Sequence, residues 1–464
     1  MNIKKFKWKR LISAALATIC FFSTPFHAKA DVYWPEGPSI NTPSAMLIEV
    51  NSGAILYEKN ADELNYPASI TKVMTTLLAL EYCELDEIVT FSEDAINLNQ
   101  GDTSHIARDY GEEMTIEQCL YAIMLESANE CSYAVAEHVG QKLGGDYQTF
   151  IDLMNEKAKD LGCTNTHFNN SNGLPDPNHW TSAHDMALIG AEAYKSETFR
   201  IIVESRSYRI PPTNKHADIT PLNNHHAMIS NYKTNKYLYE YCTGGKTGFT
   251  QDAGSTLITF AEKDGLTLVC VVMRTNGTDQ YLDTKTLFDY GFQNFQAFSL
   301  AEYASTDQEE NEDSGIMSNH ESYVDLNKEA YVVLPVTANF DDVEFTLDST
   351  NLPGNTIAQL RYSYGDHTVG KVDVVPGKAV VEDNYFYMKN PNSEVNIVEI
   401  KLSTIIWIVV GIILLIIGII VGKKLYDNYY LIVHNWNVKK QRKSRFKPIS
   451  KKKKRWRRRD RMFK

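Results

Sequence analysis

One uninterrupted apolar run near the C-terminal end limits what this 464-residue chain can fold into. The run extends from Leu402 to Gly422, and no charged residue lies between Lys401 and Lys423. About twenty helical residues, at ~1.5 Å each, match the ~30 Å hydrocarbon core of a bilayer. We therefore expect a transmembrane helix over residues 402–422, with the rest of the chain divided between the two sides of a membrane.

The segment that follows this run, residues 423–464, is strongly basic. It holds 18 Lys and Arg residues against two acidic residues, Asp427 and Asp460. Basic flanks stay on the cytoplasmic side of a membrane, so we expect the tail inside the cell and residues 31–401 outside. A nucleic-acid-binding arm can have the same composition. The position directly after a membrane span favours contact with anionic lipid instead.

The N-terminal residues 1–30 have the layout of a secretory signal peptide. Five basic residues precede a mostly apolar stretch, and Ala-Lys-Ala at 28–30 is suitable for signal peptidase. A mature chain would then begin at Asp31. The alternative is an uncleaved membrane anchor, and the shortness of the apolar stretch argues against it.

The external part is much more acidic than the whole chain. Of 47 basic and 58 acidic residues, residues 1–30 hold 6 basic ones and the tail holds 18 basic and 2 acidic ones. The remaining 23 basic and 56 acidic residues give a net charge near −33. We therefore expect no nucleic acid or anionic lipid as a partner of this part.

Cysteine and histidine spacing indicates no metal site or cofactor. Six cysteines remain once Cys20 leaves with the signal peptide, and none forms a CxxC pair. Cys119 and Cys270 lie in apolar periodic segments, which favours buried free thiols, and the disulfide state stays open. We interpret five histidines as loop or packing residues because they lack zinc-hydrolase spacing: His179, His184, His216, His225 and His226.

The external part is too long for a single core, so we expect two domains. An acidic, polar stretch at 303–322 is typical of a linker. It would separate a first domain, residues 31–302, from residues 323–400. The latter alternate short β-rich runs with turn signals such as Pro353-Gly354, which predicts a small all-β domain next to the membrane.

The first domain mixes strands and helices. Segments 45–50 and 54–58 flank a turn signal, and segments 256–260 and 266–273 flank another, so two hairpins are predicted. Between them lies a stretch of helical periodicity that includes a capping box at Thr115–Gln118. Strands at both ends with helices between predict an α+β domain whose antiparallel sheet is completed late in the chain.

The first of three short motifs is Ser69-Ile-Thr-Lys72, at the start of an apolar helix. The spacing of three residues places both side chains on one helical face. A lysine drawn into an apolar helix loses solvation, which lowers its pKa and allows it to accept the serine proton. The ordinary alternative for Ser69 is a helix N-cap, and both roles are compatible.

The second motif, Ser127-Ala-Asn129, interrupts a helical region. It would offer a hydroxyl for proton transfer and an amide for binding a substrate backbone. A capping box formed by Ser127 and Glu130 is an equally good interpretation.

The third motif, Lys246-Thr247-Gly248, occurs once in the chain and is expected at or near a strand start. Lys246 and Thr247 supply a positive charge and a hydroxyl for a substrate carboxylate. Gly248 removes a side chain where a substrate would run beside the strand. The alternative is a glycine-rich turn with an exposed lysine.

The order of these motifs resembles that of penicillin-binding proteins and related serine acyl-transferases. With the surrounding segments, such as Pro67–Thr75 and Lys246–Thr250, the external region resembles the low-molecular-mass penicillin-binding proteins of the serine D-alanyl-D-alanine carboxypeptidase family. The resemblance implies a penicillin-binding, serine β-lactamase-like transpeptidase domain, with an antiparallel sheet and a helical subdomain. It also implies peptidoglycan stem peptides as substrates and β-lactams as inhibitors.

The resemblance assigns a role to each matching residue. Ser69 would be the nucleophile, Lys72 its base and Ser127 the proton relay. Asn129 would hold the acyl side, and Lys246 and Thr247 would bind the terminal carboxylate. The N–H groups of Ser69 and Phe249 would form the oxyanion hole, and Gly248 and Phe249 complete the set of substrate-binding residues. The family commonly has His or Tyr in place of Phe249, and Asn224-His225-His226 replaces its usual Asn-x-Asn, which leaves open what assists Lys246.

Other functions share these motifs. A class A β-lactamase also needs a deacylating glutamate, and no Glu-x-x-Leu-Asn follows Asn129 before Lys246. An endopeptidase or transpeptidase differs only in the bond cut or the acceptor. A non-catalytic penicillin-binding sensor would need acylation of Ser69 but no turnover.

Overall fold

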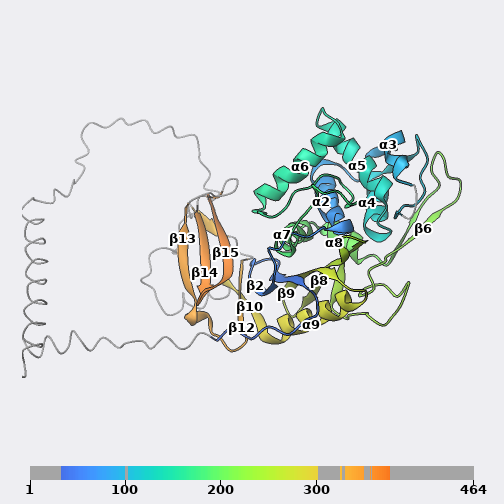
Figure 1. Cartoon of the computed structure of the whole chain (residues 1–464). Helices are drawn as coiled ribbons and strands as arrows, with labels where there is room; N and C mark the ends of the chain where they lie inside the picture. Colours follow the sequence, from blue (N-terminus) through green and yellow to red (C-terminus); the bar gives the residue numbers. More distant parts are fainter. Residues whose placement is uncertain are drawn as a thin grey trace, which may run out of the picture. The chain divides into compact units, whose positions relative to one another are not determined.

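The computed structural model describes residues 33–99, 103–300, 324–326, 330–349, 356 and 358–376 (Figure 1). The predicted signal peptide, acidic linker, transmembrane helix and basic tail lie outside the described residues. The end of the predicted β-rich domain, from residue 377, also lies outside them. Among the residues that are described, no helix is both long enough and apolar enough to cross a membrane.

A five-stranded antiparallel sheet forms the centre of the first domain. Its strand order is β2-β1-β9-β8-β7. The two N-terminal strands join strands formed about 200 residues later, since Leu47 lies opposite Cys270, so the predicted late completion of the sheet is confirmed. Both predicted hairpins are present. The strands are β1 (Ser44–Glu49), β2 (Ile55–Lys59), β7 (Cys242–Thr250), β8 (Gly254–Lys263) and β9 (Leu266–Thr275).

Helices cover both faces of this sheet (Figure 1). Side chains alternate between the faces along a strand, so on β9 Val269 and Val271 join the core of the helical subdomain. Leu268 and Val272 belong to the opposite core, which includes Leu287 of α9. The helices are α2 (Lys72–Tyr82), α3 (Glu93–Ile96), α4 (Ile116–Leu125), α5 (Asn129–Lys142), α6 (Tyr147–Asp160), α7 (Ala183–Tyr194), α8 (Glu197–Glu204) and α9 (Asp279–Asn294).

Local sequence signals explain several helix starts. The predicted capping box at the start of α4 is confirmed: Thr115 Oγ1 accepts the Gln118 N–H, and Gln118 Oε1 accepts the Thr115 N–H.

Two 3-10 turns flank helices of this domain: η1 (Ala68–Thr71) precedes α2, and η2 (Asn97–Asn99) follows α3. Two small ladders complete the domain: β3 (Ile88–Thr90) with β4 (Glu113–Thr115), and β5 (Ser207–Ile210) with β6 (Thr220–Asn223).

The described part of the second predicted domain is also β-rich. A four-stranded antiparallel sheet has the order β11-β15-β14-β13. Strand β12 instead pairs with β10 of the first predicted domain, with Ala297 opposite Val333. The boundary at residues 303–322 stays a prediction. These elements are β10 (Phe295–Ser299), β11 (Val324–Leu326), β12 (Tyr331–Pro335), η3 (Phe340–Asp342), β13 (Glu344–Asp348), β14 (Ala358–Tyr364) and β15 (His367–Pro376).

All six cysteines in the described part of the chain are free thiols. Cys119 and Cys270 are buried, as their apolar surroundings predicted.

Candidate active site

Ser69 lies in the 3-10 turn η1, directly before α2. The sequence placed it at the start of the helix, with an N-cap role as one interpretation. That N-cap role is not found, because neither η1 nor α2 has a side-chain capping bond at its start. The Ser69 hydroxyl instead faces Lys72, whose Nζ lies 3.1 Å from Ser69 Oγ.

The backbone just before Ser69 is held by two contacts from distant segments. Ala68 has a positive φ of 52°, a conformation that L residues seldom adopt. Thr256 of β8 donates a hydrogen bond of 2.8 Å to the Pro67 carbonyl. Gly173 approaches from the other side, so closely that a Cβ at this position would lie 1.8 Å from the Ala68 carbonyl oxygen. Only glycine therefore permits this approach.

Lys72 is fully buried at the first position of α2. Its Nζ is 2.7 Å from Asn129 Oδ1 and 2.6 Å from the Asn172 carbonyl oxygen, in addition to its contact with Ser69. Burial, and then the charge of Lys246, lower the pKa of Lys72 well below its ordinary value. Lys72 Nζ donates to all three oxygens, those of Ser69, Asn129 and Asn172. When Lys72 loses a proton, which its lowered pKa favours, two N–H groups can stay on the carbonyl oxygens and the lone pair can accept the Ser69 proton.

Ser127 lies between α4 and α5, and Asn129 is the first residue of α5. The capping box that competed with the functional interpretation is absent, since the N-cap of α5 is Ala128 and makes no side-chain bond. Ser127 has a positive φ of 61°, and its buried Oγ has no hydrogen-bond partner among the described residues. Asn129, which contacts Lys72, also donates its backbone N–H to the Ser104 carbonyl at 2.9 Å.

Lys246 lies in the middle of β7 rather than at its start. Gly244 and Gly245 precede it with φ of 127° and 152°, and a register shift against β8 occurs at Gly244. The alternative of a glycine-rich turn with an exposed lysine is therefore wrong, because these glycines form an irregularity within the strand. The Lys246 side chain is buried, its Nζ donates to the Thr247 carbonyl at 2.7 Å, and burial lowers its pKa to about 7.

Gly248 allows β7 to approach the nucleophile. A Cβ at this position would lie 2.9 Å from the Ser69 backbone nitrogen and 2.4 Å from Thr256 Oγ1. The next residue, Phe249, has 69% of its surface exposed. The backbone N–H of Ser69 and the Gly248–Phe249 segment therefore lie side by side, as an oxyanion hole formed by both requires.

Three residues that support this site were not assigned catalytic or binding roles from the sequence, where Glu130 appeared only as a capping partner of Ser127. Asn172 binds Lys72 through its carbonyl oxygen, and Gly173 contacts Ala68, both over about 100 residues of separation. Glu130 is buried, and its Oε1 accepts the Ile106 N–H at 2.7 Å. The contacts that give the first two residues their roles come from a distant part of the chain, so no local signal reveals them.

The histidines interpreted as packing residues all make hydrogen bonds or ion pairs within the described part of the chain. His226 lies near Lys246. Burial and the charge of Lys246 lower the pKa of His226 to about 3, so His226 is neutral. The contacts are His179 with Thr71, His184 with Asp62, His216 with Glu112, His225 with Glu126 and His226 with Thr259.

Proteins of known activity are similar to this chain in sequence. The D-alanyl-D-alanine carboxypeptidase DacF of Bacillus subtilis is 31% identical over 301 residues, which are 63% of this chain and 73% of that protein. A D-alanyl-D-alanine carboxypeptidase of a Streptomyces species is 27% identical over 266 residues, 55% of this chain and 88% of that protein.

Solved structures are also similar to this chain. The crystal structure of a Streptomyces DD-transpeptidase superimposes with a TM-score of 0.51 at 27% identity, over 56% of this chain and all of that one. Penicillin binding protein 5 from Haemophilus influenzae gives 0.57 at 25% identity, over 74% of this chain and 98% of that one. Residues 31–277, over half of the chain, match the family model described as D-alanyl-D-alanine carboxypeptidase. The chain belongs to the D-alanyl-D-alanine carboxypeptidase family.

Proposed function

We propose that the chain is a serine D-Ala-D-Ala carboxypeptidase that removes the terminal D-alanine from peptidoglycan stem peptides. The observation that carries this function is the buried amine of Lys72, 3.1 Å from the Ser69 hydroxyl and held by two carbonyl oxygens. A general base of lowered pKa beside a hydroxyl is what a serine acyl-transferase requires. β-Lactams present a reactive amide carbonyl to the same nucleophile and are expected to acylate it.

Acylation begins when neutral Lys72 takes the proton from Ser69 as Oγ attacks the carbonyl carbon between the last two D-alanines. The oxyanion that forms is stabilised by the N–H groups of Ser69 and Phe249. Lys246 and Thr247 bind the terminal carboxylate, and Asn129 holds the acyl side. The close approach of Gly248 to the Ser69 nitrogen supports this arrangement.

The same residues protonate the leaving group and then hydrolyse the acyl-enzyme. When the C–N bond breaks, the proton on Lys72 passes through the Ser127 hydroxyl to the D-alanine amine. The lack of any other partner for Ser127 Oγ among the described residues supports this relay. Water then attacks the ester, Lys72 accepts its proton, and Ser69 is regenerated.

Release of D-alanine tests the proposed activity directly. The purified full-length chain is expected to release D-alanine from a peptide that ends in D-Ala-D-Ala, because the anchor and the nucleophile are both in place. A matched peptide that ends in L-Ala should not release its terminal L-alanine. Prior incubation with a β-lactam should block release from the D-Ala-D-Ala peptide.

Other outcomes separate the alternatives. Labelling by a β-lactam without D-alanine release would replace the carboxypeptidase proposal with a sensor or an enzyme that cleaves cross-links. Rapid hydrolysis of the β-lactam would favour a β-lactamase. Neither labelling nor release by folded protein would contradict the assignment of Ser69.

We also propose that the chain is held in the cell membrane by a single helix over residues 402–422, with the catalytic part outside and the basic tail in the cytoplasm. The uncharged apolar run and the 18 basic residues that follow it support this orientation. A membrane-impermeant fluorescent β-lactam is expected to label the chain in intact cells. Labelling only after lysis would contradict the orientation.

A further inference from the structure

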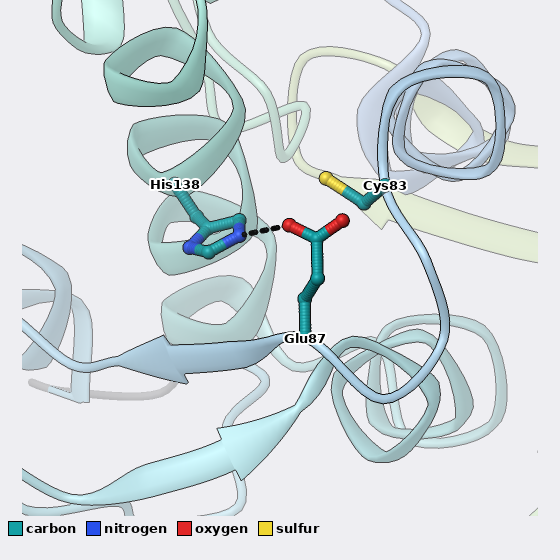
Figure 2. A group of neighbouring side chains, drawn as sticks. All are labelled: Cys83, Glu87 and His138. Carbon is teal, nitrogen blue, oxygen red and sulfur yellow. Dashed lines mark hydrogen bonds and ion pairs between the residues drawn. The ribbon is translucent and has the colours of Figure 1, made fainter.

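Three side chains of the kinds that bind zinc meet on the surface of the helical subdomain. The Cys83 thiol, the Glu87 carboxylate and the His138 imidazole have ligand atoms that all lie within 4.8 Å of one another. Figure 2 shows the three side chains pointing toward one another, two from the connection between α2 and β3 and one from α5. Cys83 ends α2, Glu87 directly precedes β3, and His138 lies in α5. We propose that Cys83, Glu87 and His138 form a zinc-binding site.

The distances fit a metal ion placed between these groups. His138 Nε2 lies 3.0 Å from Glu87 Oε2, close to the ~3.3 Å edge of a tetrahedron with zinc–ligand bonds of about 2.0 Å. The Cys83 sulfur lies within 4.8 Å of both other ligand atoms, and its bond to zinc is the longer one, ~2.3 Å. Three protein ligands leave the fourth position for water. The sulfur and nitrogen donors favour zinc over calcium or magnesium, which take oxygen ligands.

Neighbouring groups orient the carboxylate for this role. Glu87 Oε1 accepts the Glu84 N–H at 2.7 Å and a hydrogen bond from Lys142 Nζ at 2.5 Å. These two contacts hold Oε1, so Oε2 is the oxygen that faces His138. Hydrogen bonds from a second layer of groups commonly fix the ligands of metal sites in this way. The side chains of Glu87 and His138 are only 24% and 23% exposed, so the cluster is partly sheltered but open to an ion.

The site would join the far ends of the two helices that begin in the active site. Lys72 is the first residue of α2, and Asn129 is the first residue of α5. Cys83 and His138 lie at or near the opposite ends of these same helices. A bound ion would therefore stabilise the packing of α2 against α5 without touching the reacting groups. This inference does not depend on the carboxypeptidase proposal.

Other interpretations of the cluster are an ion-pair network and a reactive thiol. The contacts of Glu87 with His138 and Lys142 would form such a network without any ion.

Cobalt and zinc titrations of the full-length chain separate these interpretations. After treatment with EDTA, one equivalent of Co²⁺ is expected to give a sulfur-to-cobalt charge-transfer band in the near ultraviolet. Zn²⁺ should displace it and raise the Tm by several degrees. Cys83→Ser and His138→Ala should abolish the band and the Tm shift. Glu87→Gln, which keeps the side-chain shape, should weaken both.

Matched controls are available in the chain. Cys163 is another half-buried free thiol, and His184 pairs with Asp62 at 3.0 Å; among the described residues neither belongs to a group of three side chains that could hold a metal ion. Cys163→Ser and His184→Ala should leave the band and the Tm shift unchanged. A missing band in the wild-type chain, or a band and Tm shift that persist in Cys83→Ser, would overturn the zinc site.

Discussion

Replacing Lys72 with methionine is expected to slow the acylation of Ser69 by about 10³-fold, within the ~10²–10⁴ range of general base catalysis. Methionine is similar in length but has no lone pair that can accept the serine proton efficiently. The buried carbonyl oxygens of Asn129 and Asn172 each lose a donor, at a cost of about 1–3 kcal/mol each. The measurement is the rate of β-lactam labelling under single-turnover conditions, with Tm and circular dichroism to confirm folding.

The pH profile distinguishes a base from a residue that only supports the fold. Wild-type kcat/KM should rise as Lys72 loses its proton, and it should fall above a pH of about 7, where Lys246 loses the charge that binds the carboxylate. Lys72→Met should lack the rising limb and keep the falling one. Ser69→Ala, which has no nucleophile, sets the background. Near-normal labelling by Lys72→Met would show that another group removes the proton.

Replacing Gly173 with alanine is expected to slow acylation by at least ~10²-fold and to destabilise the fold. Its added Cβ would lie 1.8 Å from the Ala68 carbonyl oxygen, so the backbone that carries Ser69 must move. A displacement of about 1 Å at a reacting group can cost ~10²-fold in rate. The positive φ of 85° adds about 1–2 kcal/mol for an L residue. Labelling kinetics and thermal unfolding measure the two effects separately.

Gly162 provides the matched control for this substitution. It has nearly the same φ, 84°, but no atom within 4 Å of its virtual Cβ. Gly162→Ala should therefore lose only the stability that the backbone conformation costs and should label at the wild-type rate. Equal labelling by both variants would mean that the Gly173 contact does not position Ser69.

Features encoded by adjacent residues were predictable from the sequence. The hairpin of β1 and β2 and the capping box at Thr115 depend on residues within a few positions of one another. The pairing of β10 with β12 was not predictable, because each strand is an ordinary apolar run and only the folded chain brings them together. The glycines before Lys246 look like a turn from their composition, and the pairing of β7 with β8 keeps them within a strand.

The contacts of the active site also include some that the sequence predicts and others that it does not. Ser69 and Lys72 lie three residues apart, so their contact follows from helical geometry alone. Asn172 supplies a carbonyl oxygen, which every residue carries, and therefore leaves no mark in the sequence. Cys83, Glu87 and His138 were missed for a related reason. The separation of 51 residues between Glu87 and His138 resembles no metal-binding motif, and only the packing of α5 against α2 and β3 brings the three residues together.

The position of β7 at the edge of the five-stranded sheet affects how a substrate is recognised. An edge strand has one row of N–H and C=O groups without a neighbouring strand. An extended peptide can add to that row by β-augmentation, so that main-chain groups supply most of its binding. Recognition of this kind depends on the direction, chirality and free end of the peptide more than on its side chains. The same open row can also pair with another copy of the chain, and an enzyme that uses it must tolerate this risk of aggregation.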